Sequence, residues 1–415
     1  MRVLFVIPGS TDAASARYRC GHLAQALALR GHHADCVSAT ESAAIGIRHD
    51  VVVLHRIGWS GAGQRLVNAA RRAGAAVVYG ADDLIFEPEY AYQMGLAHPD
   101  DPTRYHFHRR EGDEALRCLL QTDAVLVSTE FLAARARHAF ACENVTEKPV
   151  RVLRNFVSRE ILSLSSEARE RRGIGFPPAS PEGDAVVLGY LSGSPTHDAD
   201  LAALAPVLAS VFERHAAARL LVVGPVALPP VLQPAAASGR ISRHPFVPWR
   251  DLPALLSGID INLAPLDTTR VFNHAKSEVK FLEAGAVFRP TIASAAVGFA
   301  EGVRDGHDCV LVHNATDWLT ALEPLLTDRV LREEISAQAR AGVEARATVD
   351  AVADGVAAVF EAFAGLSRTA PKGEVFVRQP LAERLERGFR RAEESTLRRL
   401  FRLARHIRLL GSEQS

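Results

Sequence analysis

Short apolar runs alternate with helical segments along most of the chain. Uninterrupted runs of Val, Ile and Leu are typical of parallel strands that are covered on both faces. Such runs predict strands at residues 3–7, 50–55, 75–80, 123–128, 150–155, 185–191, 219–224, 258–265, 290–294 and 308–312. The segments between them predict helices, among them 18–30, 63–73, 129–140, 198–213, 278–286 and 316–341. This alternation predicts an α/β protein with doubly wound parallel sheets.

The pattern stops once and then restarts, which divides the chain into two domains. Between residues 163 and 184 the apolar periodicity fades and three prolines lie close together, so we expect an interdomain linker there. Residues 1–162 and 185–350 then form two Rossmann-like domains that face each other across a cleft. In open parallel sheets the ligand binds at the carboxyl ends of the strands, so the cleft is the expected site. A closing helix is predicted at 351–366.

The remaining segment, residues 367–415, has a different charge balance. Between Arg368 and Ser415 there are 12 Lys and Arg against 6 acidic residues, and the apolar side chains fall largely on one helical face. This predicts a basic amphipathic helical tail. Such a helix either lies on an anionic membrane surface or packs on the body of the protein or on another subunit.

Composition narrows the possible partners and the compartment. The chain has 48 basic and 48 acidic residues, so its formal net charge is +0 and it lacks the basic field typical of nucleic-acid binders. Its 5 cysteines show neither a disulfide framework nor metal-ligand spacing. The apolar run at the N-terminus is too short for a signal peptide, and no window is long enough to span a membrane. We therefore expect a cytoplasmic protein, or one bound peripherally at the inner face of the cell membrane.

The most informative chemistry lies in residues 272–286, just after the predicted strand that ends at Pro265. If a helix begins near Lys276, its free N–H groups and positive end face the crevice and suit a phosphate. Lys276 and Lys280 then share one face, and Glu283 lies about one turn further on, where it can accept hydrogen bonds from a ribose. From spacing alone, an ordinary surface helix with solvated lysines is an equally good interpretation.

This segment resembles the donor-site signature of the large retaining family-four glycosyltransferases of the GT-B fold, particularly bacterial members. In these a Lys-Ser-x-x-Lys-x-x-Glu-Ala helix follows a Phe-Asn pair, as at Phe272 to Ala284 here. Further matching segments occur in the family's order over residues 1–365. They are residues 14–19, 79–86, 128–132, 188–198 and 305–312, the last leading into 318–332.

The resemblance implies transfer of a sugar from a nucleotide-diphosphate donor, bound mainly by the second domain, to an acceptor bound mainly by the first. It implies no metal and no cofactor besides the nucleotide sugar, because basic side chains and helix N-termini hold the diphosphate. Positive charge there stabilises the departing phosphate. Retention in this family is usually explained by attack on the same face, with the donor's own phosphate taking the proton. No protein general base is therefore assigned.

The resemblance also assigns roles to residues of the second domain. The diphosphate would be held by Lys276, Lys280 and the loop Ser192–Gly193–Ser194, the ribose by Glu283, and the sugar by Asn273 or His274. Ser277 lies within the signature, and Trp249 belongs to the segment 246–250, near where relatives hold the nucleobase.

Two positions depart from the family pattern. The glutamate that often lies eight residues before the one matching Glu283 is Ala275 here, so Asn273 or His274 would take over its contact with the sugar. The usual basic residue after the second domain's first strand is also missing, which leaves the two lysines to compensate.

The first domain offers candidates for the acceptor side. Arg17 and Arg19 follow the first strand and either meet a phosphate in the cleft or begin a surface helix. Asp82 either binds acceptor hydroxyls or serves as a helix cap or turn residue. Other polar residues of this domain are His55 and Arg56 at a strand end, and His106 and His108 on a loop or a solvated helix face.

The sequence therefore predicts a glycosyltransferase that extends a bacterial surface glycan or modifies a secondary metabolite. The acceptor is expected to be a glycan, a lipid-linked glycan or a small molecule, and not a nucleic acid. Two alternatives stay open at this point. One is a nucleotide-sugar epimerase of the same architecture, and the other is a catalytically silent scaffold that binds a partner enzyme or a membrane through its basic tail.

Overall fold

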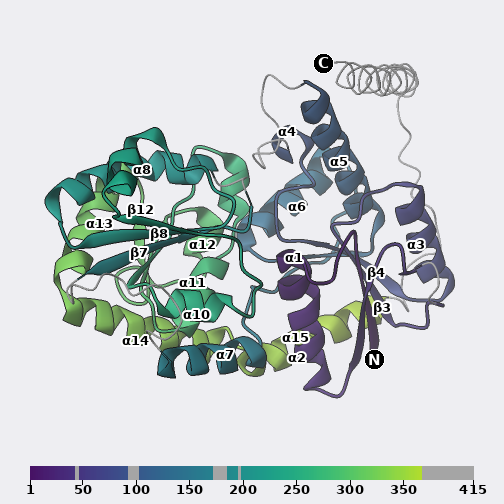
Figure 1. Cartoon of the computed structure of the whole chain (residues 1–415). Helices are drawn as coiled ribbons and strands as arrows, with labels where there is room; N and C mark the ends of the chain where they lie inside the picture. The colour runs from purple at the N-terminus through teal and green to yellow at the C-terminus, as the bar shows by residue number, and fades with distance from the viewer. Residues whose placement is uncertain (43–45, 92–101, 172–184, 195–197, 367–415) are drawn as a thin grey trace, which may run out of the picture. The chain divides into compact units, whose positions relative to one another are not determined.

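The computed structural model describes residues 1–42, 46–91, 102–171, 185–194 and 198–366, which all lie in one compact unit. Their strands form two six-stranded sheets in which the neighbouring strands are parallel (Figure 1). The predicted doubly wound α/β architecture is therefore confirmed for this part of the chain. The basic tail predicted at 367–415 lies outside the described residues.

The first sheet has the order β2-β1-β3-β4-β5-β6. Its strands are β1 (Arg2–Ile7), β2 (His33–Ser38), β3 (Val51–His55), β4 (Ala76–Ala81), β5 (Ala124–Val127) and β6 (Val150–Val152). The helical segments of this domain are α1 (Ala14–Ala16), a π-helical turn η1 (Arg17–Gly21), α2 (His22–Ala28), α3 (Gly61–Arg72), α4 (Pro88–Ala91), α5 (Pro102–Gln121), α6 (Glu130–Cys142) and α7 (Arg159–Glu170). The segment 14–28 is thus continuously helical, and it begins earlier than predicted.

The second sheet has the order β12-β11-β10-β7-β8-β9. Its strands are β7 (Val186–Leu191), β8 (Ala218–Val223), β9 (Ile241–His244), β10 (Ile261–Ala264), β11 (Thr291–Ser294) and β12 (Val310–Val312). The helical segments are α8 (Asp198–Arg214), η5 (Pro230–Leu232), α9 (Gln233–Ala237), α10 (Leu252–Ser257), η6 (Val271–Ala275), α11 (Val279–Ala286), α12 (Val297–Ala300), α13 (Ala315–Thr327), α14 (Arg329–Arg346) and α15 (Val349–Leu366). Counted in chain order, these strands have the 3-2-1-4-5-6 arrangement of a Rossmann fold.

The sequence pattern missed two strands, β2 and β9, and both are edge strands. Each contains polar or half-exposed residues, as in Ile241-Ser-Arg-His, where the central Ser242 and Arg243 are exposed. An edge strand has a neighbour on one side only and is less covered, so it lacks the continuous apolar run of a central strand.

The linker predicted at 163–184 is wrong over its first part. Helix α7 continues to Glu170, with Ile161, Ser165 and Ala168 buried at helical spacing and Ser158 capping its first turn. The side chains between these buried positions are Leu, Ser and Glu, which are exposed or half-buried, and one of the buried positions is itself a serine, so the segment lacks a clear apolar pattern. Helix α7 packs against α10 and α11 of the second domain. Residues 172–184 lie outside the described part of the chain.

The helix predicted at 316–341 is in fact two helices, α13 and α14. Asp328 has an extended backbone that ends α13, and its carboxylate accepts a hydrogen bond of 3.0 Å from the N–H of Leu331 to cap α14. A good N-cap residue at this point favours a new helix over continuation of the old one.

The last described helix, α15, returns to the first domain and packs against α2. The Phe360 ring makes an edge-to-face contact with Phe5 of β1 at 5.7 Å and another with Phe363 at 5.8 Å. One buried apolar cluster includes these rings together with Phe281 and Val343 of the second domain. The core therefore runs without interruption from one sheet to the other. None of the described helices is long and apolar enough to cross a membrane.

We expect Phe360→Ala to lower the free energy of unfolding by about 3–5 kcal/mol, because it leaves a cavity where α15 crosses the first domain. Thermal unfolding of the purified protein measures the loss. Leu366→Ala is the matched control, since Leu366 is only half-buried at the end of the same helix. An equal effect of the two substitutions would contradict this view of α15.

Candidate functional site

The carboxyl ends of the two sheets bring charged side chains of both domains together. In the first domain these side chains follow β1, β3 and β4, and in the second they follow β7 and β10. Two direct contacts join the groups: Lys276 Nζ lies 2.7 Å from Asp83 Oδ1, and Tyr18 Oη lies 2.8 Å from Glu283 Oε1. The predicted cleft is therefore lined by both domains and is closed by ion pairs and hydrogen bonds.

Helix α11 begins at Val279, close to the start predicted at 278, so the condition that a helix begin near Lys276 is not met. Residues 271–275 form a separate 3-10 turn, and Lys276 has an extended backbone that leads away from it. Glu278 occupies the N-cap position without capping, since Arg154 of the first domain binds its carboxylate. Lys276 and Lys280 consequently do not share a helix face. They reach the crevice from different backbone conformations.

Lys280 has the most unusual environment of the described charged residues. Its amine is buried, lies 4.9 Å from the centroid of the Tyr190 ring and has no hydrogen-bond partner. Burial lowers its pKa, and Lys276 acts in the same direction, while the carboxylates of Asp200 and Glu283 oppose the shift. A buried cation without a hydrogen-bonded anion costs free energy. The position is therefore suited to an anionic ligand.

Glu283 lies one helical turn from Lys280, as expected, and its carboxylate accepts the hydrogen bond from Tyr18. Burial raises the pKa of Glu283, although Tyr18, Arg17 and Lys280 lower it. Burial also raises the pKa of Tyr18 well above its usual value, so the hydroxyl keeps its proton. No local sequence pattern indicates this pair, because the two residues are 265 positions apart.

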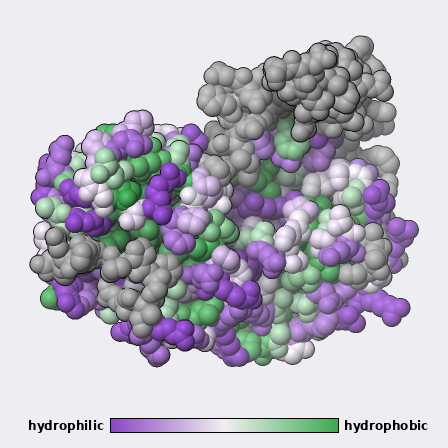
Figure 2. Space-filling view, in the orientation of Figure 1, coloured by the Kyte–Doolittle hydropathy of each residue, from purple (hydrophilic) through white to green (hydrophobic). Residues whose placement is uncertain are grey.

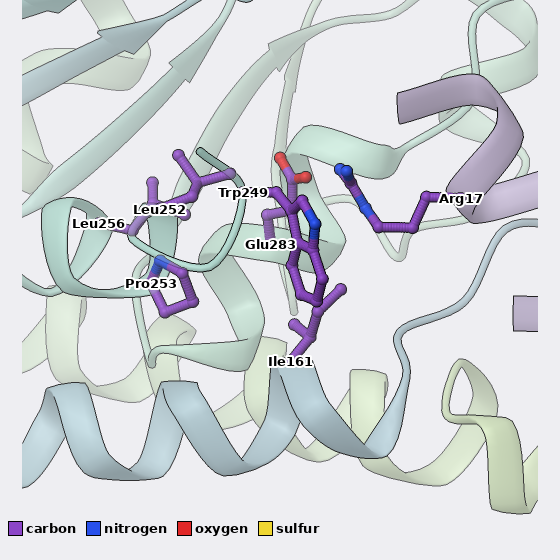
Figure 3. Close-up of a pocket in the computed structure, with 7 residues that line it drawn as sticks. All are labelled: Arg17, Ile161, Trp249, Leu252, Pro253, Leu256 and Glu283. Atoms are coloured by element: carbon purple, nitrogen blue, oxygen red, sulfur yellow. The ribbon is translucent and has the colours of Figure 1, made fainter. Parts of the chain in front are cut away.

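Figure 3 shows a small pocket beside Glu283 in which Arg17 points toward Trp249. The guanidinium of Arg17 lies 4.9 Å from the centroid of the Trp249 ring, and Arg250 lies 4.3 Å from it. The Nε atom of Arg17 is buried without a hydrogen-bond partner. The pocket encloses about 10 Å³, which is room for about one water molecule. Trp249 thus packs against arginines, and Arg17 faces the crevice as predicted.

A network of hydrogen bonds follows the first-domain strands. Ser15 donates to Asp82 Oδ2 at 2.8 Å and lies 2.7 Å from His55 Nε2, which must then carry its hydrogen toward Ser15. Arg56 donates to Asp82 at 2.6 Å and also to Asp83. Arg56 adopts a left-handed backbone with φ 55°, which a non-glycine residue accepts only under constraint from its surroundings.

This network fixes the charge states of its members. Burial alone would raise the pKa of Asp82, but Arg56 and His55 outweigh it and hold that pKa well below its usual value. The same carboxylates raise the pKa of Arg56 against the effect of burial. Asp82 was predicted to bind acceptor hydroxyls; both of its oxygens take hydrogen bonds from within the first domain. Asp82 lies at the edge of the crevice, and its oxygens already have hydrogen-bond partners.

The structure does not support the predicted contact of Arg19 with the acceptor. Its side chain is buried and donates to the carbonyl of Leu153 and to Asn155 Oδ1, and burial lowers its pKa. Asn155 in turn donates to Ser277 Oγ at 2.6 Å. Arg19 and Ser277 thus belong to a chain of contacts between the domains. Arg19 follows Arg17 and Tyr18 on the helical turn η1. At its position on this turn the side chain is buried.

The remaining predicted residues lie around the same crevice. Asn273 is buried and donates to the carbonyl of Asp267 at 3.0 Å, while His274 Nδ1 lies 3.2 Å from the N–H of Val297. Ser192 and Ser194 form a tight loop after β7 in which the Ser192 hydroxyl donates to the Ser194 carbonyl at 2.9 Å. The loop lies directly against Gly224, where a Cβ would meet the Ser192 carbonyl oxygen at 1.9 Å.

Some expected residues fall outside this site. His106 lies in a stretch whose side chains are not described, and His108 pairs with Glu111 at 3.1 Å on α5. Among the described residues, no group of three or more His, Cys, Asp or Glu is arranged to hold a metal ion.

Comparison with known protein families finds a match within the second domain. Residues 186–328 match the family model described as "Glycosyl transferases group 1". This segment contains β7 to β12 with Lys276, Lys280 and Glu283. No curated protein matches the sequence.

Solved structures that are similar to this chain cover both domains. HepE of Anabaena, described in complex with UDP and glucose, has 14% identity and a TM-score of 0.60 over 87% of this chain and 99% of its own. Sucrose-phosphate synthase of Thermosynechococcus elongatus has 15% identity and a TM-score of 0.59 over 87% and 98%. WaaG, described as a glycosyltransferase involved in lipopolysaccharide biosynthesis, has 15% identity and a TM-score of 0.55 over 86% and 99%. The GT-B fold is therefore confirmed.

Buried His55 predicts how stability changes with pH. Burial lowers its pKa from 6.5 to about 3, so between these values the unfolded chain binds a proton that the folded chain does not. Stability must then fall as the pH drops through this window. We expect His55→Gln to remove about 2–3 kcal/mol of the loss between pH 6.5 and pH 4.

Thermal unfolding at a series of pH values measures this difference. His33→Gln is the control, because the His33 side chain is 60% exposed on an edge strand. If the wild type and His55→Gln lost stability in parallel, His55 would not be the buried neutral group that the structure shows.

Proposed function

We propose that this protein transfers a sugar from a nucleoside-diphosphate sugar to an acceptor. The proposal rests on the buried amine of Lys280, which lies at the carboxyl end of the second sheet and has no hydrogen-bond partner. An anionic diphosphate would supply the missing hydrogen-bonded charge, and a charge-assisted bond there is among the stronger interactions available to a protein. The family match over residues 186–328 and the UDP-bound structure of HepE support the same ligand class.

The proposed donor site combines three kinds of group. Lys280 and Lys276 face the diphosphate, with the backbone of the Ser192–Gly193–Ser194 loop beside them. Glu283 holds the ribose through its carboxylate, and Asn273 or His274 lies toward the sugar. Trp249 and its neighbours lie toward the base, where Arg17 also reaches.

The positive charge serves the reaction as well as binding. When the bond between the sugar and the diphosphate breaks, negative charge grows on the phosphate oxygens, and cations in a poorly solvated site stabilise that charge. We propose that the reaction proceeds with retention, that the leaving phosphate takes the acceptor proton, and that no metal is needed. The acceptor side is formed by Arg17 and the edge of the first-domain network near Asp82.

Binding is tested by a thermal-shift screen against UDP, GDP, ADP and dTDP, each with and without its common sugars. A ligand at 100 times its dissociation constant adds about 2.7 kcal/mol to stability, which gives a measurable shift. Absence of any shift would favour the scaffold over the transferase. Release of an epimerised or free sugar without an acceptor would favour the epimerase.

The substitution Lys280→Met tests the role of the buried Lys280 amine directly. We expect nucleotide affinity to fall at least about tenfold, or about 1.4 kcal/mol, because a cation that faces the diphosphate is lost. At the same time the ligand-free protein should become more stable, by about 1–3 kcal/mol, because a buried polar group without a partner is removed. The two effects have opposite signs, which is typical of a residue kept for function.

Lys148→Met is the matched control. Lys148 is also largely buried, and burial lowers its pKa to about 8, but its amine donates to the carbonyls of Leu120 and Thr122 at 2.5 and 2.6 Å. Its removal should lower stability by about 1–3 kcal/mol and leave nucleotide affinity unchanged. The proposal fails if Lys280→Met behaves as Lys148→Met does.

A further inference from the structure

Two of the groups assigned to the donor are already engaged by side chains of the first domain. Lys276 Nζ lies 2.7 Å from Asp83 Oδ1. Glu283 Oε1 accepts the hydrogen bond of 2.8 Å from Tyr18 Oη. Each contact joins one domain to the other, and each engages a group that the nucleotide would use.

The chemistry of each contact matches that of the missing ligand. Asp83 presents a carboxylate oxygen to an ammonium group, as a phosphate oxygen would. Tyr18 presents a neutral hydroxyl to a carboxylate, as a ribose hydroxyl would, and its raised pKa keeps it a donor.

Both first-domain groups are held firmly in place. Asp83 is buried, and its second oxygen accepts a hydrogen bond from Arg56, which Asp82 orients in turn. Tyr18 is also buried, on the π-helical turn that follows α1. A fixed partner loses little conformational freedom when it makes its contact, so both contacts compete effectively with a ligand.

The pocket beside Glu283 is too small for a nucleobase. The pocket between Arg17, Trp249 and Glu283 encloses about 10 Å³, whereas small-molecule sites usually enclose about 300–1,000 Å³. In this conformation Arg17 covers the Trp249 ring. A nucleobase can reach this ring only if Arg17, a first-domain residue, moves away from it.

A second set of contacts joins the domains without using the donor-binding groups. Arg154 binds Glu278 and lies 2.9 Å from Glu301, whose carboxylate also accepts hydrogen bonds from the N-terminus of α6 at 2.8 and 3.0 Å. These contacts leave the Lys276 amine and the Glu283 carboxylate untouched. They can persist while the donor contacts break.

We propose that the first domain holds the donor site closed by imitating the donor, with Asp83 in place of a phosphate oxygen and Tyr18 in place of a ribose hydroxyl. The inference rests on the proposed function. Donor binding must exchange both contacts for those of the nucleotide, and it is thereby linked to separation of the domains around the Arg154 contacts. The apparent affinity for the donor is reduced by the fraction of molecules that are closed.

The test measures the affinity of the full chain for UDP, GDP, ADP and dTDP, and for inorganic pyrophosphate, by calorimetry. We expect Asp83→Asn to tighten binding of a nucleoside diphosphate and of pyrophosphate by about tenfold, because Lys276 is released. Tyr18→Phe should tighten binding of the nucleoside diphosphate and of pyrophosphate alike, by about fivefold, because loss of its contact raises the fraction of open molecules. The double variant should show the product of the two gains.

Two controls separate imitation from simpler effects. Asp12→Asn removes an exposed carboxylate from the loop before α1, and it should leave affinity unchanged if general charge is not the cause. The 2′,3′-dideoxy form of the same nucleotide, which has no ribose hydroxyl to offer to Glu283, should bind more weakly to both the wild type and Tyr18→Phe, while the gain of Tyr18→Phe over the wild type remains.

The outcomes are distinct. Unchanged or weaker binding in both Asp83→Asn and Tyr18→Phe, with a wild type that binds a nucleotide, overturns the imitation and leaves the proposed function standing. Gains in Asp12→Asn as large as those in Asp83→Asn also overturn it. If neither the wild type nor any variant binds a nucleotide, the proposed function itself is wrong.

Discussion

The structure depends on the meeting of two parallel sheets at their carboxyl ends. This arrangement brings charged and polar side chains of both domains into a poorly solvated crevice, where each charge needs a partner. Asp82, Asp83 and Arg56 satisfy one another, and Lys276 joins them from the second domain. Lys280 alone among these groups has no hydrogen-bond partner in the described structure. That imbalance is the basis of the anion site that we propose in the crevice.

The surrounding fold is built to keep this crevice in place. The buried cluster that includes Phe5, Phe281 and Phe360 continues from one domain into the other, and α15 returns to pack on α2. Glycines permit the closest approaches, since a side chain at Gly302 would overlap the carboxylate of Glu278 at 2.3 Å. Figure 2 shows hydrophilic residues scattered over the visible face of both domains.

Stability of the free protein and binding of an anion make opposite demands on such a site. A cation without a partner destabilises the free protein. It favours binding of a diphosphate, and during the reaction it stabilises the negative charge on the leaving phosphate. The first domain relieves part of this cost by offering Asp83 to Lys276 and Tyr18 to Glu283. Under the proposed function, these two contacts stabilise the free protein at the expense of donor affinity.

The sequence by itself determined the fold class, most of the strands and the segment that carries the two lysines, because central strands and amphipathic helices leave local periodic patterns. It missed the edge strands β2 and β9, whose composition is mixed, and the separate turn at 271–275, in which Phe272 and Ala275 are buried. Only the tertiary structure decided that Arg19 points inward, that Tyr18 meets Glu283 and that Asp83 meets Lys276. Those contacts join residues more than a hundred positions apart, and no local pattern records them.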